Sequence, residues 1–308
     1  MIRRTSIFIA VLIAIAILAP IAAPYEAGES FLGFLHAPPM RPHFDGVSPV
    51  VYPLVLADRL EQRFEPDRSR TVKLPWVERD STAPVFLLGA DDFGRDVLSR
   101  LLYGARTSIG LALFATLGAV LIGALAGAWA GYRGGWVDDA IMRVADFVLV
   151  LPVIYVVLVL RAVLPLVLPA STVFLLVSWI FVVVGWPFVA KGVRAIVAGE
   201  REREYVLAAR SLGAGPIRIL TVHLIPACGG HLLVQATLLL PAFILAEATL
   251  SFIGLGFPDP VASWGTMLAG AGNYNAVARF PWTLAPAAAI FFVVLATNLL
   301  ITRDSGRG

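Results

Sequence analysis

Charged residues are scarce in this sequence: Asp, Glu, Lys and Arg make up 15% of its 308 residues. A soluble protein carries about 25% charged residues, whereas hydrophobic residues reach 58% here and the mean hydropathy is +0.82. The shortage of charge argues against an ordinary soluble protein and predicts one that crosses a membrane several times. The net charge of +3 is too small to indicate a nucleic-acid partner.

Cysteine and histidine are also scarce. The single Cys228 can form no disulfide within the chain, and the four histidines show no HExxH spacing, so we expect neither a metal site nor a cofactor. A GxxxxGK[ST] phosphate loop is missing from the sequence as well. Any work driven by ATP must therefore be done by another protein.

Long apolar runs predict an all-α integral membrane protein with about six transmembrane helices and both termini in the cytoplasm. Residues 1–24 form the first span, which we prefer to a cleaved signal peptide, and an external polar insertion follows it. Cations gather in the connections that this topology places inside, as expected for cytoplasmic loops. The five-helix domain at 107–302 holds spans at about 107–131, 145–163, 171–190, 232–250 and 284–302, and residues 303–308 form a cytoplasmic tail.

The external segment, 25–106, is rich in proline and too short to bury much of a core. We expect a short amphipathic helix from Leu54 to Phe64 and an interfacial helix at the end of the segment, capped by Asp91 or Asp92. A cation site built from these acids and Asp96 is the alternative, but capping and pairing with arginine explain the acids without a metal.

Two features of the spans indicate function. Gly123, Gly127 and Gly131 recur every four residues, which lets two helices approach closely, either within the chain or at an interface with a partner. Glu247 is an ionisable residue near the end of the fifth span, and such residues mark functional sites by default. We therefore predict that Glu247 belongs to the translocation path, with a place at the outer interface as the alternative.

A polar island at 191–231 separates the fourth and fifth spans and predicts two short helices around a bend. Gly213 allows a left-handed helix end, and Pro216 suits the first turn of the next helix. We expect one narrow face of the first helix to dock in a groove of another protein, with a helix lying on lipid headgroups as the alternative. Glu204 opens this helix, and the face consists of Tyr205, Ala208, Ala209 and Leu212.

Three stretches resemble the inner-membrane permease subunits of binding-protein-dependent ABC importers, in the dipeptide, oligopeptide and nickel group. The first stretch is Gly89 to Asp96 with Tyr103 to Arg106. The second is the island, which is similar to the so-called EAA loop. The third is Glu247 to Gly256 with Ser263-Trp264-Gly265.

This resemblance implies a multi-pass protein of the plasma (inner) membrane, in contact with lipid, and an ATP-driven importer for dipeptides or oligopeptides. The partners would be a second, similar permease, two cytoplasmic ATPase subunits and an external substrate-binding protein. The island would be the coupling loop. The same machinery importing nickel or another small solute is the first alternative, and a self-contained secondary transporter is the second.

The island departs from the family pattern at one position. Leu207 stands where the family has an acid, although Ala208, Ala209 and Gly213 still match. Because Leu207 lies off the expected docking face, we expect docking to depend on that face and on the bend at Gly213.

Overall fold

The computed structural model describes residues 2–45, 48–59, 62–76, 83–152, 155–159 and 168–305. The chain divides into two compact units. Unit 1 comprises Met1–Ile7, Leu111–Ala246 and Val294–Gly308, and unit 2 comprises Phe8–Gly110 and Glu247–Val293. Arg161 and Pro165, which the sequence places near the fold-back between the third and fourth spans, lie outside the described residues.

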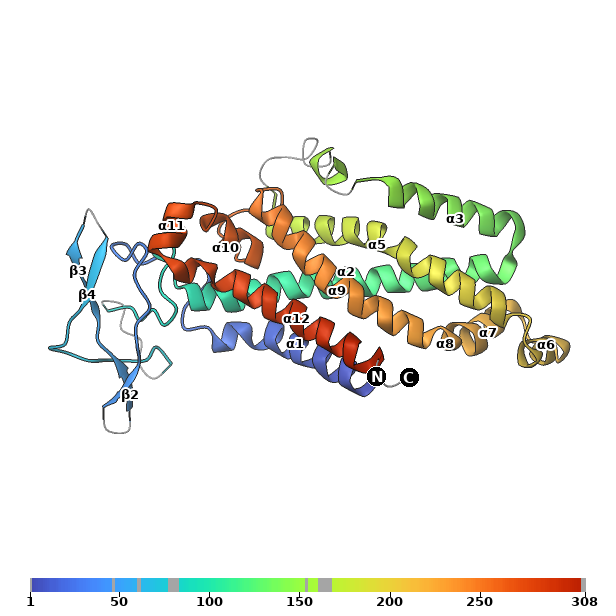
Figure 1. Cartoon of the computed structure of the whole chain (residues 1–308), viewed down its shortest axis with the longest axis horizontal. Helices are drawn as coiled ribbons and strands as arrows, with labels where there is room; N and C mark the ends of the chain where they lie inside the picture. The colour runs from blue at the N-terminus through green and yellow to red at the C-terminus, as the bar shows by residue number, and fades with distance from the viewer. Residues whose placement is uncertain are drawn as a thin grey trace. The chain divides into compact units, whose positions relative to one another are not determined.

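Most of the described chain is helical (Figure 1), and four of its helices are long and apolar enough to cross a membrane. They are α2 (Val97–Arg133), α5 (Ala170–Glu200), α9 (Gly229–Phe252) and the stretch Pro281–Leu299, which joins η2 (Pro281–Leu284) to most of α12 (Ala285–Ser305). Two further helices are α1 (Ile2–Ala22) and α3 (Gly135–Val150).

The helices near the second span differ from the sequence-based expectation. α2 runs without a break from Val97 to Arg133, so no separate interfacial helix ends at 106. No proline interrupts this stretch. The gap expected between the spans at 107–131 and 145–163 is also mostly helical, because α3 begins directly after Gly134. Gly134 and Gly135 have φ values of 66° and 55°, a left-handed conformation that reverses the chain within two residues.

The helices at the third and fourth predicted spans also end at residues other than those expected. α3 ends at Val150, because Pro152 lacks an N–H group and restricts the residue before it. α5 continues to Glu200, ten residues beyond the expected end of the fourth span. The first ten residues of the polar island are therefore part of a long helix. This helix is held by an ion pair between Lys191 and Asp146.

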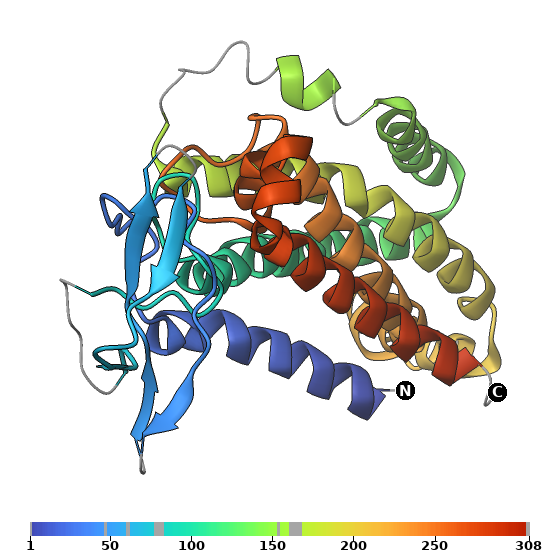
Figure 2. The ribbon, with the colours of Figure 1, turned by 60° about the vertical axis from the view of Figure 1, so that its left-hand side comes forward.

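The described residues of the external segment before α2 form no helix, which corrects the all-α assignment for this part of unit 2. Three short strands, β1 (His43–Asp45), β2 (Ser48–Val51) and β5 (Val72–Lys73), form an antiparallel sheet in the order β1-β2-β5. β3 (Leu54–Asp58) and β4 (Arg63–Pro66) form a separate antiparallel hairpin. The blue strands in Figure 2 show both sheets.

The hairpin replaces the amphipathic helix expected from Leu54 to Phe64. Strand pairing sets Leu54 opposite Pro66, and both Leu54 and Phe64 pack against one core cluster. Phe64 also stacks on Phe34 with ring centroids 6.0 Å apart. The segment therefore builds a larger core than its length suggested. The buried members of the cluster are Ala37, Met40, Val51, Val85, Phe86 and Ala90.

In unit 1, the glycines of α2 form a seam against α5. A Cβ on Gly123 would lie 2.5 Å from the Cβ of Val189, and one on Gly127 would lie 2.3 Å from the carbonyl oxygen of Ala190. At Gly131 the nearest atom is the carbonyl oxygen of Arg194, at 2.6 Å. The glycine repeat thus faces a helix of the same chain, which is the first of the two interpretations that its spacing allowed.

The seam predicts that Gly127→Ala destabilises the protein. The added methyl group would press on backbone atoms of α5, and overpacking of this kind costs about 1–3 kcal/mol. We expect a lower midpoint of thermal unfolding for the variant purified in detergent. The matched control is Gly110→Ala, also in α2, where a Cβ would meet no atom within 4 Å. Equal midpoints for Gly127→Ala and wild type would contradict the seam.

Candidate functional site

A short helix, α6 (Glu204–Ser211), follows α5 and carries most of the predicted coupling residues (Figure 1). Its end has the hydrogen bonds of a Schellman motif: the N–H of Gly213 donates to the carbonyl of Arg210, and that of Ala214 donates to the carbonyl of Ala209, both at 3.0 Å. Gly213 has a φ of 85°, so the predicted left-handed helix end is confirmed.

The chain then turns into a second short helical stretch. α7 (Pro216–Ile219) begins with Pro216 in its first turn, as predicted, and continues through a π-helical segment, η1 (Leu220–Leu224), into α8 (Ile225–Ala227). The two helices around a bend that the sequence predicted are thus present in the structure.

Tyr205 connects three parts of this loop. Its hydroxyl donates a hydrogen bond of 2.7 Å to Glu200 at the end of α5, and its ring lies 6.0 Å from the ring of His223 in η1. The hydrogen bond to Glu200 and that residue's negative charge raise the pKa of Tyr205. Tyr205 therefore fixes α6 to α5 and is more than a residue of the docking face.

The rest of the predicted face is largely free of intrachain packing. Leu212 is 89% exposed, Ala208 is exposed and Ala209 is half-buried. Val206, which the sequence analysis did not single out, is the one buried residue of α6 and anchors the helix. An apolar side chain as exposed as Leu212 next to a rigid bend is the kind of surface that a partner protein covers.

Leu207 lies on the exposed surface of α6, in the position of the family's acid. Two flanking cations that an acid there could pair with have other partners. Arg203 lies 3.8 Å from Glu200, and the guanidinium of Arg210 lies over the ring of Tyr132, 5.7 Å from its centroid. Arg203 and Arg210 therefore have partners even though position 207 carries no acid.

Polar contacts that the sequence reasoning missed hold the base of the loop. The guanidinium of Arg194 donates from Nε to both carboxylate oxygens of Asp138, at 2.9 and 3.0 Å. Arg201 donates to the carbonyl of Gly131 at 3.1 Å. The loop is thus attached to α2 and α3 by charged hydrogen bonds. The opposite charges at 138 and 194 were visible in the sequence, but their pairing depends on the unexpected start of α3 at Gly135.

Glu247 is enclosed in unit 2, with 1% of its surface exposed. Its two carboxylate oxygens accept hydrogen bonds from the hydroxyls of Ser108 at 2.6 Å and of Ser251 at 2.7 Å. The hydroxyl of Ser108 in turn accepts the backbone N–H of Trp264 at 3.1 Å. Glu247 therefore connects α2 and α9 to the first residue of α10 (Trp264–Gly270).

Glycines allow this close junction. A Cβ on Gly104 would lie 3.0 Å from the Trp264 ring, and one on Gly265 would lie 2.6 Å from the carbonyl oxygen of Ala248. The indole N–H of Trp264 donates to the carbonyl of Leu101 at 3.1 Å. Two of the stretches that carry the family resemblance, 103–106 and 247–265, thus meet in one place. Their separation in the sequence gave no sign of this contact.

Glu247 should be needed for stability. In Glu247→Leu the hydroxyls of Ser108 and Ser251 lose their acceptor, and each buried unsatisfied group costs about 1–3 kcal/mol. We expect a clear fall in the midpoint of thermal unfolding in detergent. Glu247→Gln keeps the shape and one acceptor oxygen, so its midpoint should fall less. If Glu247→Leu is as stable as wild type, the hydrogen bonds from Ser108 and Ser251 do not stabilise the protein.

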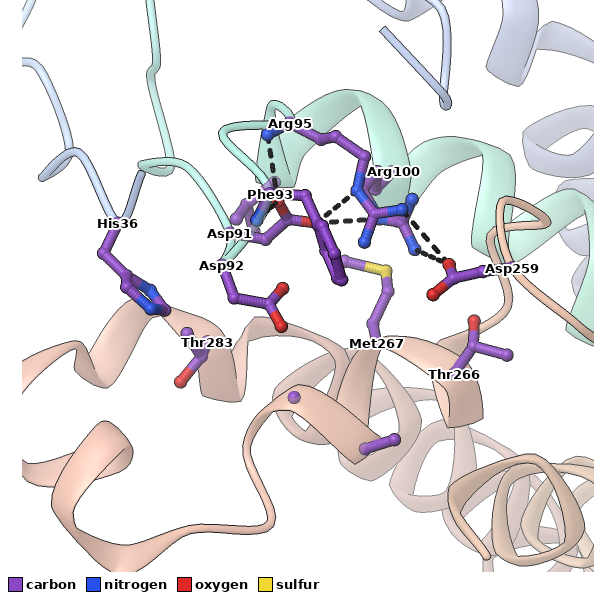
Figure 3. A pocket seen from close by; sticks show the side chains of 13 residues that line it. His36, Asp91, Asp92, Phe93, Arg95, Arg100, Asp259, Thr266, Met267 and Thr283 are labelled. Atoms are coloured by element: carbon purple, nitrogen blue, oxygen red, sulfur yellow. Dashed lines mark hydrogen bonds and ion pairs between the residues drawn. The ribbon is translucent and has the colours of Figure 1, made fainter. Parts of the chain in front are cut away.

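An ion-pair network lies near the start of α2 in unit 2 (Figure 3). Asp91 accepts from Arg95 Nε at 2.7 Å and lies 3.4 Å from Arg100, and Asp259 accepts from Arg95 at 3.1 Å. Among the described residues, no group of three His, Cys, Asp or Glu is arranged to hold a metal ion.

Asp96, rather than Asp91 or Asp92, caps α2. Its Oδ2 accepts the backbone N–H and the hydroxyl of Ser99 at 2.7 and 2.6 Å. Its Oδ1 is buried without a hydrogen-bond partner in the described structure. Burial raises the pKa of Asp96 from its ordinary value of 3.8 to about 6. The shift makes the charged form of this carboxyl unfavourable in the folded chain.

This shift predicts a pH dependence of stability. The folded chain holds the Asp96 proton at a higher pH than the unfolded chain, so the stabilising effect is complete below about pH 4 and is lost as the pH rises through about 6. A shift of this size corresponds to about 3 kcal/mol. In Asp96→Asn, which can still cap the helix, this part of the dependence should vanish. Thermal unfolding midpoints of both proteins between pH 4 and 7 test it, and parallel curves would contradict the prediction.

Comparison with known proteins gives consistent matches. Residues 119–303 match the family model "Binding-protein-dependent transport system inner membrane component". The di/tripeptide transport system permease protein DppC of Pseudomonas aeruginosa is 34% identical over 296 residues, which cover 96% of this chain and 82% of the relative.

Two further relatives match over shorter regions. The oligopeptide transport system permease protein OppC of Bacillus subtilis is 38% identical over 64% of this chain and 62% of its own length. The dipeptide transport system permease protein DppC of Alkalihalophilus pseudofirmus is 36% identical over 69% of this chain and 67% of its own length.

Proposed function

Because this chain belongs to the family of binding-protein-dependent transport system inner membrane components, we propose that it couples ATP hydrolysis by cytoplasmic ATPases to solute import through the loop at 191–231. The resemblance stated from the sequence is confirmed. The protein is a permease component of the inner membrane and not an enzyme, and separate ATPase subunits hydrolyse ATP.

The observation that carries the proposal is the exposed, rigid α6. Its surface offers Leu212 to a partner, while Val206 and the Tyr205–Glu200 hydrogen bond fix it to the end of α5. A partner that moves α6 therefore also moves α5. The predicted coupling residues are Glu204, Tyr205, Ala208, Ala209, Leu212 and Gly213.

We propose a topology of six crossings with both termini in the cytoplasm, on the same side as the loop. The cations at Arg133, Arg143, Arg303 and in the loop support this orientation through the positive-inside rule. The four helices that meet the length and hydropathy criteria fit four of these crossings. α1 and the stretch that begins with α3 would supply the other two.

The partners that we propose are a second, homologous permease, two ATPase subunits and an external substrate-binding protein. Family membership supports an assembly with other permease and ATPase components. The sheets of 25–88 would face the external side, where the binding protein delivers the solute.

Short peptides are the proposed solute. Three relatives carry the names of dipeptide, di/tripeptide or oligopeptide permeases. Glu247 would act on the translocation path through the position of α9, since its carboxylate is fully engaged by Ser108 and Ser251.

The coupling role predicts that Gly213→Val blocks transport while the protein still inserts in the membrane. A Cβ at 213 would meet no atom within 4 Å, so the harm comes only from the left-handed backbone, which a β-branched residue resists. We expect ATP-driven uptake of a labelled dipeptide, in vesicles that contain all partners, to fall at least tenfold.

The matched control is Gly215→Val, since Gly215 also has open space around it but an ordinary φ of −71°. It should retain uptake within about twofold. Leu212→Lys is a second arm, because a side chain this exposed can change without unfolding the protein, and it should weaken co-purification of the ATPase. Normal uptake in Gly213→Val and normal ATPase binding in Leu212→Lys would together refute the coupling role.

A further inference from the structure

Two cavities of unit 2 share His36 in their lining. The first has a volume of about 240 Å³ and is lined by His36, Asp91, Asp92, Arg95, Arg100 and Asp259, among others. The second has a volume of about 420 Å³, and its lining includes His36, Arg63, Phe64, Arg279, Phe280 and Trp282.

The first cavity carries an uncompensated negative charge. Arg95 and Arg100 are engaged by Asp91 and Asp259 on the same wall. Asp92 has no ion pair within the described structure, and Figure 3 shows its carboxylate pointing into the cavity. Burial and the charge of Asp91 raise the pKa of Asp92, which a cation beside it would reverse.

The second cavity carries the opposite charge. Arg63 pairs with Glu65 at 2.8 Å, but Arg279, in the last turn of α11 (Tyr274–Arg279), has no ion pair in the described part of the chain. The rings of Phe64, Phe280 and Trp282 line the same space. No acidic residue is among the described residues that line this cavity, so the carboxylate of a ligand would be a suitable partner for Arg279.

Hydrogen bonds and ring stacking hold the segments around His36 together. The N–H of His36 donates to the carbonyl of Asp91 at 2.9 Å, and the indole N–H of Trp282 donates to the carbonyl of Ala90 at 2.9 Å. The imidazole stacks on Phe280, with the centroids 4.1 Å apart and the planes 3° from parallel. The two charged groups are therefore carried by segments that are hydrogen-bonded or stacked on one another.

Backbone strain marks the same place. His36 and Gln62 both have a φ of 52°, and they are the two non-glycine residues with positive φ in the described structure. Both line the second cavity. Residues held in this conformation cluster at ligand sites, where the surrounding structure fixes them.

We propose that the two cavities form one binding site for a small zwitterion, whose protonated amine lies at Asp92 and whose carboxylate lies at Arg279, across the ring of His36. A short peptide with free ends has both groups, so the proposal rests on the proposed function and specifies it further. The site selects for both free ends, because each blocked end leaves one charged side chain without a partner.

The test measures binding to the full-length chain in lipid nanodiscs by isothermal titration calorimetry. The probes are alanyl-alanine, its N-acetyl derivative and its C-terminal amide. For wild type we expect alanyl-alanine to bind at least fivefold more tightly than either blocked form. Asp92→Asn should abolish the preference over the N-acetyl form and keep the preference over the amide. Arg279→Gln should do the reverse.

The control variants are Asp45→Asn and Arg59→Gln, which change exposed residues that line neither cavity and should keep both preferences. Equal binding of the three probes to wild type would overturn the site, as would the loss of both preferences together in either variant. Failure of ATP-driven peptide uptake with binding intact would refute the proposed function and leave the site standing. Normal ATP-driven uptake without the preference of wild type for alanyl-alanine over the blocked forms would refute the site and leave the proposed function standing.

Discussion

The close backbone contact between α2 and α5 is the constraint on which unit 1 depends. Lipid chains are as apolar as leucine side chains, so helices in a bilayer gain little by burying apolar surface and associate through packing. Glycines at 123, 127 and 131 bring the α2 backbone against residues 186–198 of α5. Because the contacts at Gly127 and Gly131 are made with backbone atoms of α5, the two helices cannot slide past each other without losing them.

The buried carboxylates of Glu247 and Asp138 both have polar partners inside this mostly apolar chain. Glu247 accepts from two serines, and Asp138 pairs with Arg194. An unpaired group at either place would carry the full cost of its desolvation. Polar contacts therefore join the helices at the junction in unit 2 and at the base of the loop in unit 1, and they fix which helix faces meet.

The sequence predicted the features that depend on local chemistry. Gly213 and Pro216 gave the bend and the start of α7, and the apolar runs located α9 and α12 closely. The sequence did not predict the features that depend on contacts between residues far apart in the chain. The hairpin of β3 and β4 exists because Leu54 and Phe64 share a core with Phe86. Likewise, Arg194 lies 56 residues from Asp138, and Ser108 lies 139 residues from Glu247, separations that no periodicity in the sequence can indicate.

The proposed coupling role requires a loop whose parts are firmly connected, and hydrogen bonds connect the parts of this loop. The Schellman hydrogen bonds fix the end of α6, Tyr205 fixes its start to α5, and Arg201 attaches the end of α5 to Gly131. A force on Leu212 is thus carried through a short, hydrogen-bonded helix into one that packs backbone to backbone on α2. The left-handed Gly213 sets the angle of this connection, so in the proposed coupling role the bend acts through its geometry and not through side-chain chemistry.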